Sequence, residues 1–160
     1  MTELVAPDGR AVLEEEQTTA VHAPDSPDAY RIDFELLVRA KDRDVTFGRY
    51  GVVGLAVRMP WDKSSAPAVH LNANGLRGRD CEQQRAAWCT VERPLGGQIF
   101  GIAVFDHPSN PNHPSGWRVD EQGLINPAVS MTGDWTLAAG KRAATVTDSS
   151  FTRGRVAPPC

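Results

Sequence analysis

Hydrophobic and polar residues alternate most clearly along residues 30–40, in the sequence YRIDFELLVRA. A period of two sends successive side chains to opposite faces of a strand, so that one face is buried and the other meets water. The apolar face of this segment consists of Tyr30, Ile32, Phe34, Leu36 and Val38, and the polar face includes Arg31, Asp33, Glu35 and Arg39. The pattern predicts a half-buried antiparallel strand.

Shorter apolar runs of the same character lie at residues 44–48 (DVTFG), 51–59 (GVVGLAVRM) and 98–105 (QIFGIAVF). Clusters of Gly, Pro, Asn and Asp separate them, as turns separate the strands of all-β proteins. We therefore expect a mainly β protein with few or no helices. Its architecture would be an antiparallel β-sandwich, or half of a larger supersandwich-like sheet.

Two segments do not fit a single pattern. Residues 10–23 (RAVLEEEQTTAVHA) combine an acidic, helix-compatible run with β-branched residues. Residues 79–92 (RDCEQQRAAWCTVE) allow a helix, but a strand is favoured because Ala87, Cys89 and Val91 would share one face and both neighbouring segments are strands.

Composition and charge narrow the function classes. The 160 residues carry a formal net charge of −3, which gives no electrostatic reason to expect nucleic acid or an anionic membrane as a partner. The start of the chain lacks the features of a signal peptide, and no apolar run is long enough to span a bilayer, so we expect a cytoplasmic protein. Cys81, Cys89 and Cys160 match no zinc or redox spacing and are interpreted as unpaired core thiols.

The densest group of chemically active residues lies in VFDHPSNPNHPSGWRV, from Val104 to Val119. Its three prolines fix the backbone and remove amide donors, so the segment predicts an ordered loop at the end of a strand. Asp106, His107 and His113 are candidate catalytic residues, because a carboxylate can orient an imidazole and raise its basicity, and Asn110 is a candidate binding residue. The same residue types also form ordinary turns, so a purely structural loop remains the alternative.

A metal site is a weaker hypothesis for this loop. His107, His113 and Asp106 are the candidate ligands, but their spacing is not one of the compact zinc patterns and no further ligand is identifiable. The sequence predicts no particular cofactor.

Three other residues could take part in binding. Arg58 and Arg118 are candidates to hold an anionic or hydroxylated substrate, and Trp117 could stack on a sugar ring. The structural alternatives are arginines paired with surface carboxylates and a tryptophan that caps the core.

Several motifs also resemble a known family. In order, DVTFG, YGVVGLAVRMP, HLNANGLRGRD, AAWC, FGIAVFDHPSNPNHPSGWRV, GLINPA and GDWTLAAGK are similar to the C-terminal half of the PmoA-like family, soluble bacterial proteins often labelled methane oxygenase. The resemblance runs from about Pro7 to Lys141. It implies a β-sandwich whose small-molecule ligand is a sugar or a related compound. It also implies a further N-terminal half, with a His-His-Arg-Gly motif, that this chain would lack.

The tail departs from that resemblance. The family strand resembles Tyr-Arg-Tyr-Arg-Leu followed by aliphatic residues, whereas this chain ends ATVTDSSFTRGRVAPPC. Ordinary codons for residues 144–152, read one frame away, would encode Tyr-Arg-Tyr-Arg-Leu-Leu-Val-His. We therefore expect one domain over residues 1–143 and a disordered, out-of-frame tail over 144–160, with an exposed sheet edge where the last strand is missing.

Two functions of different class follow. The first is an enzyme that acts on a sugar or related small molecule, with His107 or His113 as general acid or base. The second is a non-catalytic carbohydrate-binding or interaction module built on Trp117 and the loop. An inactive gene fragment is the third possibility.

Overall fold

The computed structural model describes residues 1–24, 26–49 and 54–156. Within these ranges the only helical element is the short 3-10 helix η1 (Gly78–Cys81), and none of the described residues forms a helix that could cross a membrane. The expected mainly β, antiparallel fold is confirmed. The strands are β1 (Thr2–Val5), β2 (Ala11–Val21), β3 (Ala29–Ala40), β4 (Val45–Phe47), β5 (Val57–Arg58), β6 (Val69–Asn72), β7 (Trp88–Leu95), β8 (Gln98–Asp106), β9 (Gly116–Val119), β10 (Leu124–Ala128), β11 (Trp135–Leu137) and β12 (Arg142–Arg153).

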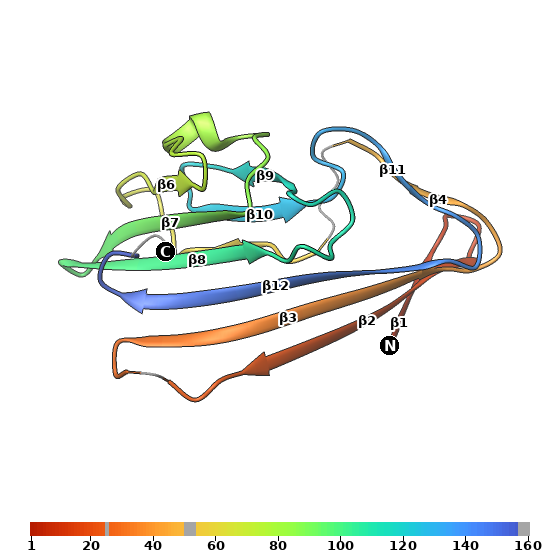
Figure 1. The fold of residues 1–160 in the computed structure, drawn as a ribbon, viewed down its shortest axis with the longest axis horizontal. Coiled ribbons are helices and arrows are strands. Elements are labelled where there is room, and N and C mark those ends of the chain that lie inside the picture. The colour runs from red at the N-terminus through yellow and green to blue at the C-terminus, as the bar shows by residue number, and fades with distance from the viewer. Residues whose placement is uncertain (25, 50–53, 157–160) are drawn as a thin grey trace.

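The strands form one large sheet and two small ones. The large sheet has the order β1-β2-β3-β12-β8-β7-β6, and the small sheets have the orders β5-β10-β9 and β11-β4. Figure 1 shows β9 and β10 lying over the β7 and β8 end of the large sheet, while β4 and β11 lie at the far end of β3 and β12. The arrangement is sandwich-like, with each small sheet covering part of the large one.

A hydrophobic core lies between each small sheet and the large one. The first core joins β7 and β8 to β9 and β10, and Val91, Val104, Trp117 and Ile125 are fully buried in it. The second core packs Leu36 and Val38 of β3, among others, with Leu137 of β11. The predicted alternation is confirmed in the second half of β3, where Leu36 and Val38 are buried and Glu35 and Arg39 are exposed. It fails in the first half, because Tyr30 is 43% exposed and residues 32–34 are all half-buried.

β12 overturns the expectation for the tail. This strand lies between β3 and β8, and it pairs with β3 along eleven consecutive residues, from Arg142 to Thr152. Phe151 also stacks on Tyr30, with the ring centroids 4.9 Å apart. The predicted disorder is wrong for residues 144–153, because backbone hydrogen bonds on both sides hold a polar segment that has little apolar patterning of its own. Residues 157–160 lie outside the described residues.

The ambiguous segments are also settled. Residues 11–21 form β2, and residues 79–92 divide into the end of η1, an irregular stretch and the first half of β7. Cys89 and Val91 face the core as expected, but Ala87 is exposed and its neighbour Ala86 is buried. The strand expected at 51–59 is only partly tested, since 51–53 lie outside the described residues and β5 is just Val57–Arg58.

The two described cysteines are buried core thiols, as predicted. Cys81 and Cys89 are free and fully buried, and Cys160 lies outside the described residues. A hydrogen bond with the Cys81 thiol, together with burial, raises the pKa of the Cys89 thiol well above its ordinary value. A thiol of this kind is protonated at neutral pH and unreactive.

His70 on β6 makes stability depend on pH. It is buried, its Nε2 lies 3.0 Å from the Leu124 carbonyl oxygen, and burial lowers its pKa from the ordinary 6.5. Because the unfolded chain then binds a proton more readily than the folded one, this contribution to stability is complete above about pH 6.5 and declines as the pH falls below it.

We expect His70→Gln to flatten that decline, which for one group cannot exceed about 1.4 kcal/mol per pH unit. Urea unfolding of both proteins at several pH values between 5 and 7.5 measures it. Equal slopes for the variant and the parent would contradict the assignment to His70.

Candidate functional site

The loop between β8 and β9, residues 107–115, is ordered by consecutive turns, in agreement with the prediction. The Asn110 amide donates to the His107 carbonyl oxygen at 2.9 Å, and the His113 amide donates to the Asn110 carbonyl oxygen at 3.1 Å. Asn112 has a φ of +62°, a conformation that asparagine tolerates better than most residues, and the His113–Pro114 peptide bond is cis. The loop therefore folds back over the end of β8.

Asp106, the last residue of β8, is the centre of the site. Its side chain is only 1% exposed and accepts three hydrogen bonds. Oδ1 accepts from Asn110 Nδ2 at 2.7 Å, and Oδ2 accepts from His113 Nδ1 at 2.9 Å and from the Ser115 backbone amide at 2.6 Å. These donors compensate for the lost hydration of a buried carboxylate.

His113 is the residue that the carboxylate orients. Since Asp106 Oδ2 accepts, the proton of the neutral ring sits on Nδ1 and the lone pair is on Nε2. Nε2 makes no hydrogen bond with any described residue, and the side chain is 24% exposed. The pair therefore resembles the arrangement in which a carboxylate fixes the tautomer of a basic histidine.

Asn110 connects the site to the sheet. Its side-chain oxygen accepts from the Val146 amide of β12, and its Nδ2 donates to the Val146 carbonyl oxygen, both at 2.7 Å. The same Nδ2 donates to Asp106. All hydrogen-bonding groups of the Asn110 side chain are thus engaged by the protein. The buried side chain adds a hydrogen-bonded link between the end of β8 and β12, so it does not serve as a ligand contact.

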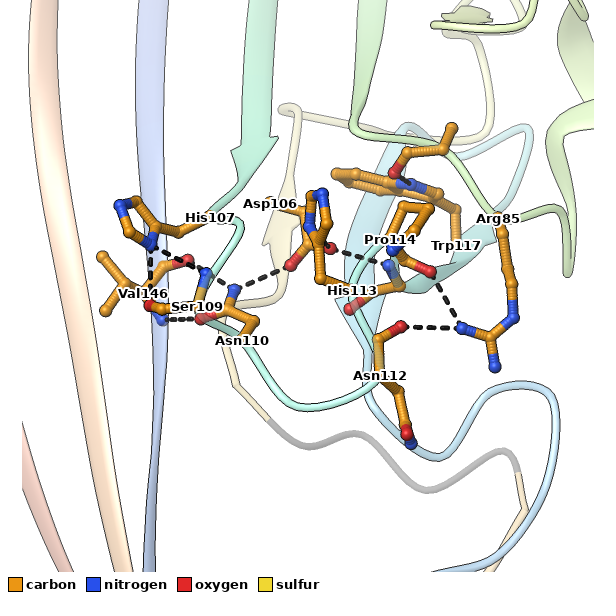
Figure 2. Close-up of polar contacts among 12 residues, drawn as sticks. Arg85, Asp106, His107, Ser109, Asn110, Asn112, His113, Pro114, Trp117 and Val146 are labelled. Carbon is orange, nitrogen blue, oxygen red and sulfur yellow. Dashed lines mark hydrogen bonds and ion pairs between the residues drawn. The ribbon is translucent and has the colours of Figure 1, made fainter.

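His107 is separated from this group. It is exposed, and its Nδ1 accepts from the Ser109 amide at 3.2 Å and lies 2.7 Å from the Ser109 hydroxyl. In Figure 2, His107 lies beside Val146 and Ser109, apart from Asp106 and His113, which lie next to each other. The structure brings Asp106, Asn110 and His113 together and leaves His107 outside the group.

Arg85 is a supporting residue that the sequence did not reveal. Its guanidinium donates to the carbonyl oxygens of Asn112 at 2.7 Å and Pro114 at 2.9 Å (Figure 2). It also donates to the Thr132 hydroxyl at 2.8 Å. These bonds hold the backbone on either side of His113. No local pattern marks an arginine of this kind, because its partners lie 27 to 47 residues further along the chain.

The two candidate substrate-binding arginines bond to residues outside the group formed by Asp106, Asn110 and His113. Arg118 Nη1 donates to Glu82 Oε1 at 2.6 Å, while Arg58 binds Gln122 and lies 3.4 Å from Asp120 Oδ2. Both are therefore paired as in the structural alternative, and neither guanidinium is held ready for a ligand.

Trp117 corrects another expectation. Its side chain is fully buried in the first core, and its Nε1 donates to the Ala86 carbonyl oxygen at 2.8 Å. A ring enclosed on all sides cannot stack on a sugar, so its role is that of a core residue.

The described residues contain no group of three or more His, Cys, Asp or Glu side chains placed to hold a metal ion. Asp106 and His113 are within reach of one another, but the Nδ1 and Oδ2 atoms that meet are already joined by a hydrogen bond.

The model of a family of unknown function, DUF6807, matches residues 2–155, so the chain belongs to this family. No curated protein matches the chain, and no solved structure matches it.

This match corrects the resemblance to the PmoA-like family, because the family model that matches the chain is DUF6807, whose function is unknown. The match also continues to residue 155 and so includes most of the tail that the resemblance had placed outside the family. Together with β12, this removes the support for an out-of-frame tail.

Proposed function

We propose that this member of DUF6807 binds a small hydroxylated molecule, a sugar or a related compound, and that His113 accepts or donates a proton at one of its hydroxyl groups. The observation that carries the proposal is the buried Asp106 carboxylate at 2.9 Å from His113 Nδ1. It leaves Nε2 as a basic nitrogen that faces away from the carboxylate.

The chemistry follows from the two nitrogens of one ring. When Nε2 takes a proton, the imidazolium is stabilised by the carboxylate on its other side, and Asp106 acts as a positioning residue without contacting the substrate. General acid–base catalysis of this kind typically contributes about 10²- to 10⁴-fold to a rate.

The class of ligand is argued from the side chains around His113. Asn110 and Arg85 are committed to protein partners, and Ser115 donates its amide to Asp106. With these groups engaged, a ligand recognised by charge has little to bind here. A hydroxyl that hydrogen-bonds to Nε2 fits better than a carboxylate or a phosphate.

The test uses NMR of the histidine rings in the full chain, with a panel of neutral monosaccharides that includes glucose, galactose and xylose as probes. We expect a binding sugar to shift the His113 ring signals, while those of His107 stay unchanged. His113→Gln should weaken binding by about tenfold or more, which corresponds to roughly 1.4 kcal/mol. His107→Gln, in the same loop, is the matched control and should bind as the parent does.

Two further outcomes decide the mechanism. Asp106→Asn is expected to lower the rate of conversion of a bound sugar, because an amide beside Nδ1 does not stabilise the imidazolium as the buried carboxylate does. Conversion of a bound sugar that is lost in His113→Gln supports proton transfer. Binding without conversion would leave a non-catalytic binding module, and binding that only His107→Gln abolishes would overturn the proposal.

A further inference from the structure

A cavity of about 750 Å³ lies on the inner face of the large sheet, which is the face that carries the two cores. It lies at the end of the sheet where β2 joins β3, and Figure 1 shows the β7–β8 turn and the end of β12 at the same end of the molecule. Asp106 and His113 do not line it, so this cavity is separate from the site described above.

The floor of the cavity is apolar and aromatic. Phe151 of β12 lies between Tyr30 of β3 and Ile102 of β8 in the register of the sheet. Phe100 comes two residues before Ile102 in β8 and therefore shares its face. Phe100 and Phe151 pack against the first core but are only partly buried, and Tyr30 is 43% exposed. The apolar surface of the first core thus continues into the open cavity.

Hydrogen bonds hold the walls of the cavity on both sides. On one side, the carbonyl oxygen of Pro60 accepts from the buried Arg93 guanidinium at 2.8 Å. On the other side, where Pro27 and Asp28 line the cavity, the Asp28 carbonyl oxygen accepts from the Arg153 amide at 2.7 Å. The cavity is therefore preformed, and its volume falls in the range of about 300–1,000 Å³ that is typical of small-molecule pockets.

The charged groups at the rim are paired with one another. Arg153 Nε lies 3.8 Å from Asp28 Oδ1, and His22 Nε2 lies 2.6 Å from Asp33 Oδ2. An ionic ligand would have to displace one of these partners and lose its own hydration in an apolar cavity. The charges at the rim therefore match an uncharged ligand.

Tyr30 supplies a polar group at the cavity. Its ring stacks on Phe151, with the centroids 4.9 Å apart and the ring planes 5° apart. Its hydroxyl makes no hydrogen bond within the part of the chain that the structure describes. One residue thus offers both an aromatic surface and a hydrogen-bonding group to a ligand.

We propose that this cavity binds a small uncharged molecule with an aromatic ring. The ring of the ligand packs against Tyr30 and Phe151, since aromatic rings attract one another in stacked or edge-to-face arrangements. A single polar group on the ligand, such as a hydroxyl, hydrogen-bonds with the Tyr30 hydroxyl. This site does not depend on the proposed binding of a sugar at His113.

The test is the equilibrium binding of naphthol to the full chain at neutral pH, together with NMR of the aromatic rings. We expect saturable binding that shifts the ring signals of Tyr30 and Phe151 and leaves those of His113 unchanged. Naphthoate and naphthylmethylamine carry the same ring system with a negative and a positive charge. Both should bind at least about tenfold more weakly than naphthol.

Tyr30→Ala removes the aromatic surface and should weaken naphthol binding at least about tenfold. Tyr30→Phe keeps the ring and removes the hydroxyl, so we expect a smaller loss of about threefold to tenfold. Trp61→Ala is the matched control, because Trp61 is 44% exposed and does not line the cavity, and it should bind naphthol as the parent does. Circular dichroism verifies the fold of each variant.

Several results would overturn the proposal. One is the absence of naphthol binding up to its solubility limit, and another is binding that shifts other rings but not those of Tyr30 and Phe151. Tighter binding of naphthoate than of naphthol would contradict an uncharged ligand. A dimer in sedimentation that does not bind naphthol would show that a second copy of the chain closes the cavity. The ring signals of the parent decide the matter if Tyr30→Ala does not fold.

Discussion

Replacing Arg93 by methionine is expected to lower the free energy of unfolding by roughly 3–5 kcal/mol. Arg93 lies in β7 with its side chain fully buried, and it carries a positive charge into the interior. Removing it would take the guanidinium donors away from the backbone carbonyl oxygens of Pro60, Ala66 and Gln122, whereas that of Glu121 keeps the Ala68 amide as a donor. A buried unsatisfied polar group costs about 1–3 kcal/mol, and methionine can fill the volume but donates nothing.

The contacts of Arg93 explain the size of the effect. Nε donates to the Ala66 carbonyl oxygen at 2.9 Å, and Nη2 donates to that of Glu121 at 2.7 Å. Nη1 donates to the carbonyl oxygens of Pro60 at 2.8 Å and Gln122 at 3.1 Å. The Arg93 guanidinium thus joins two loops that are distant in sequence.

Urea unfolding of Arg93→Met and the parent measures the difference. Arg79→Met is the matched control, because Arg79 is 79% exposed and pairs at the surface with Glu121, and exposed pairs contribute about 0–1 kcal/mol. Similar losses for the two variants would show that the buried contacts of Arg93 contribute little.

Trp117→Ala is expected to destabilise the protein by about 3–5 kcal/mol, as large-to-small changes in packed cores do. Trp117 joins β9 to the large sheet in the first core, where it is the largest fully buried side chain. The loss therefore follows from a cavity in the core, and it would occur in the absence of any ligand.

Trp117→Phe separates the two contributions of this residue. It keeps an aromatic ring in the core but removes the hydrogen bond from Nε1 to the Ala86 carbonyl oxygen, so we expect a smaller loss than for alanine. Thermal and urea unfolding measure both variants, with Trp61→Ala as the control at a side chain that is 44% exposed. A Trp117→Ala protein as stable as the parent would contradict the core assignment.

The sequence predicted the strands whose own residues mark a buried face, either by alternation or by an apolar run. β3 and β8 followed from alternation and from an apolar run bounded by turn residues. β12 did not, because Thr145, Thr147 and Ser149 put polar side chains on its inner face, and its place depends on hydrogen bonds from β3 and β8. Partners supplied by distant strands leave no local pattern.

The site shows the same division. Asp106 and His113 were candidates because their residue types and their rigid loop fit a preorganised pair, and they do meet. Their spacing alone could not show that His107 would turn away or that Trp117 would be enclosed. No sequence pattern marked Arg85 or Arg93, because each donates hydrogen bonds to backbone carbonyl groups, which every residue has.

The hydrogen-bonded link that Asn110 makes to β12 should slow the exchange of one amide proton with solvent. The Val146 amide proton is held by the Asn110 side chain, so the loop must open before that proton exchanges with solvent. Its exchange rate in deuterated water therefore measures how often the loop leaves His113 unsupported. A ligand that closes over His113 would lengthen the lifetime of this single proton in the middle of the sheet.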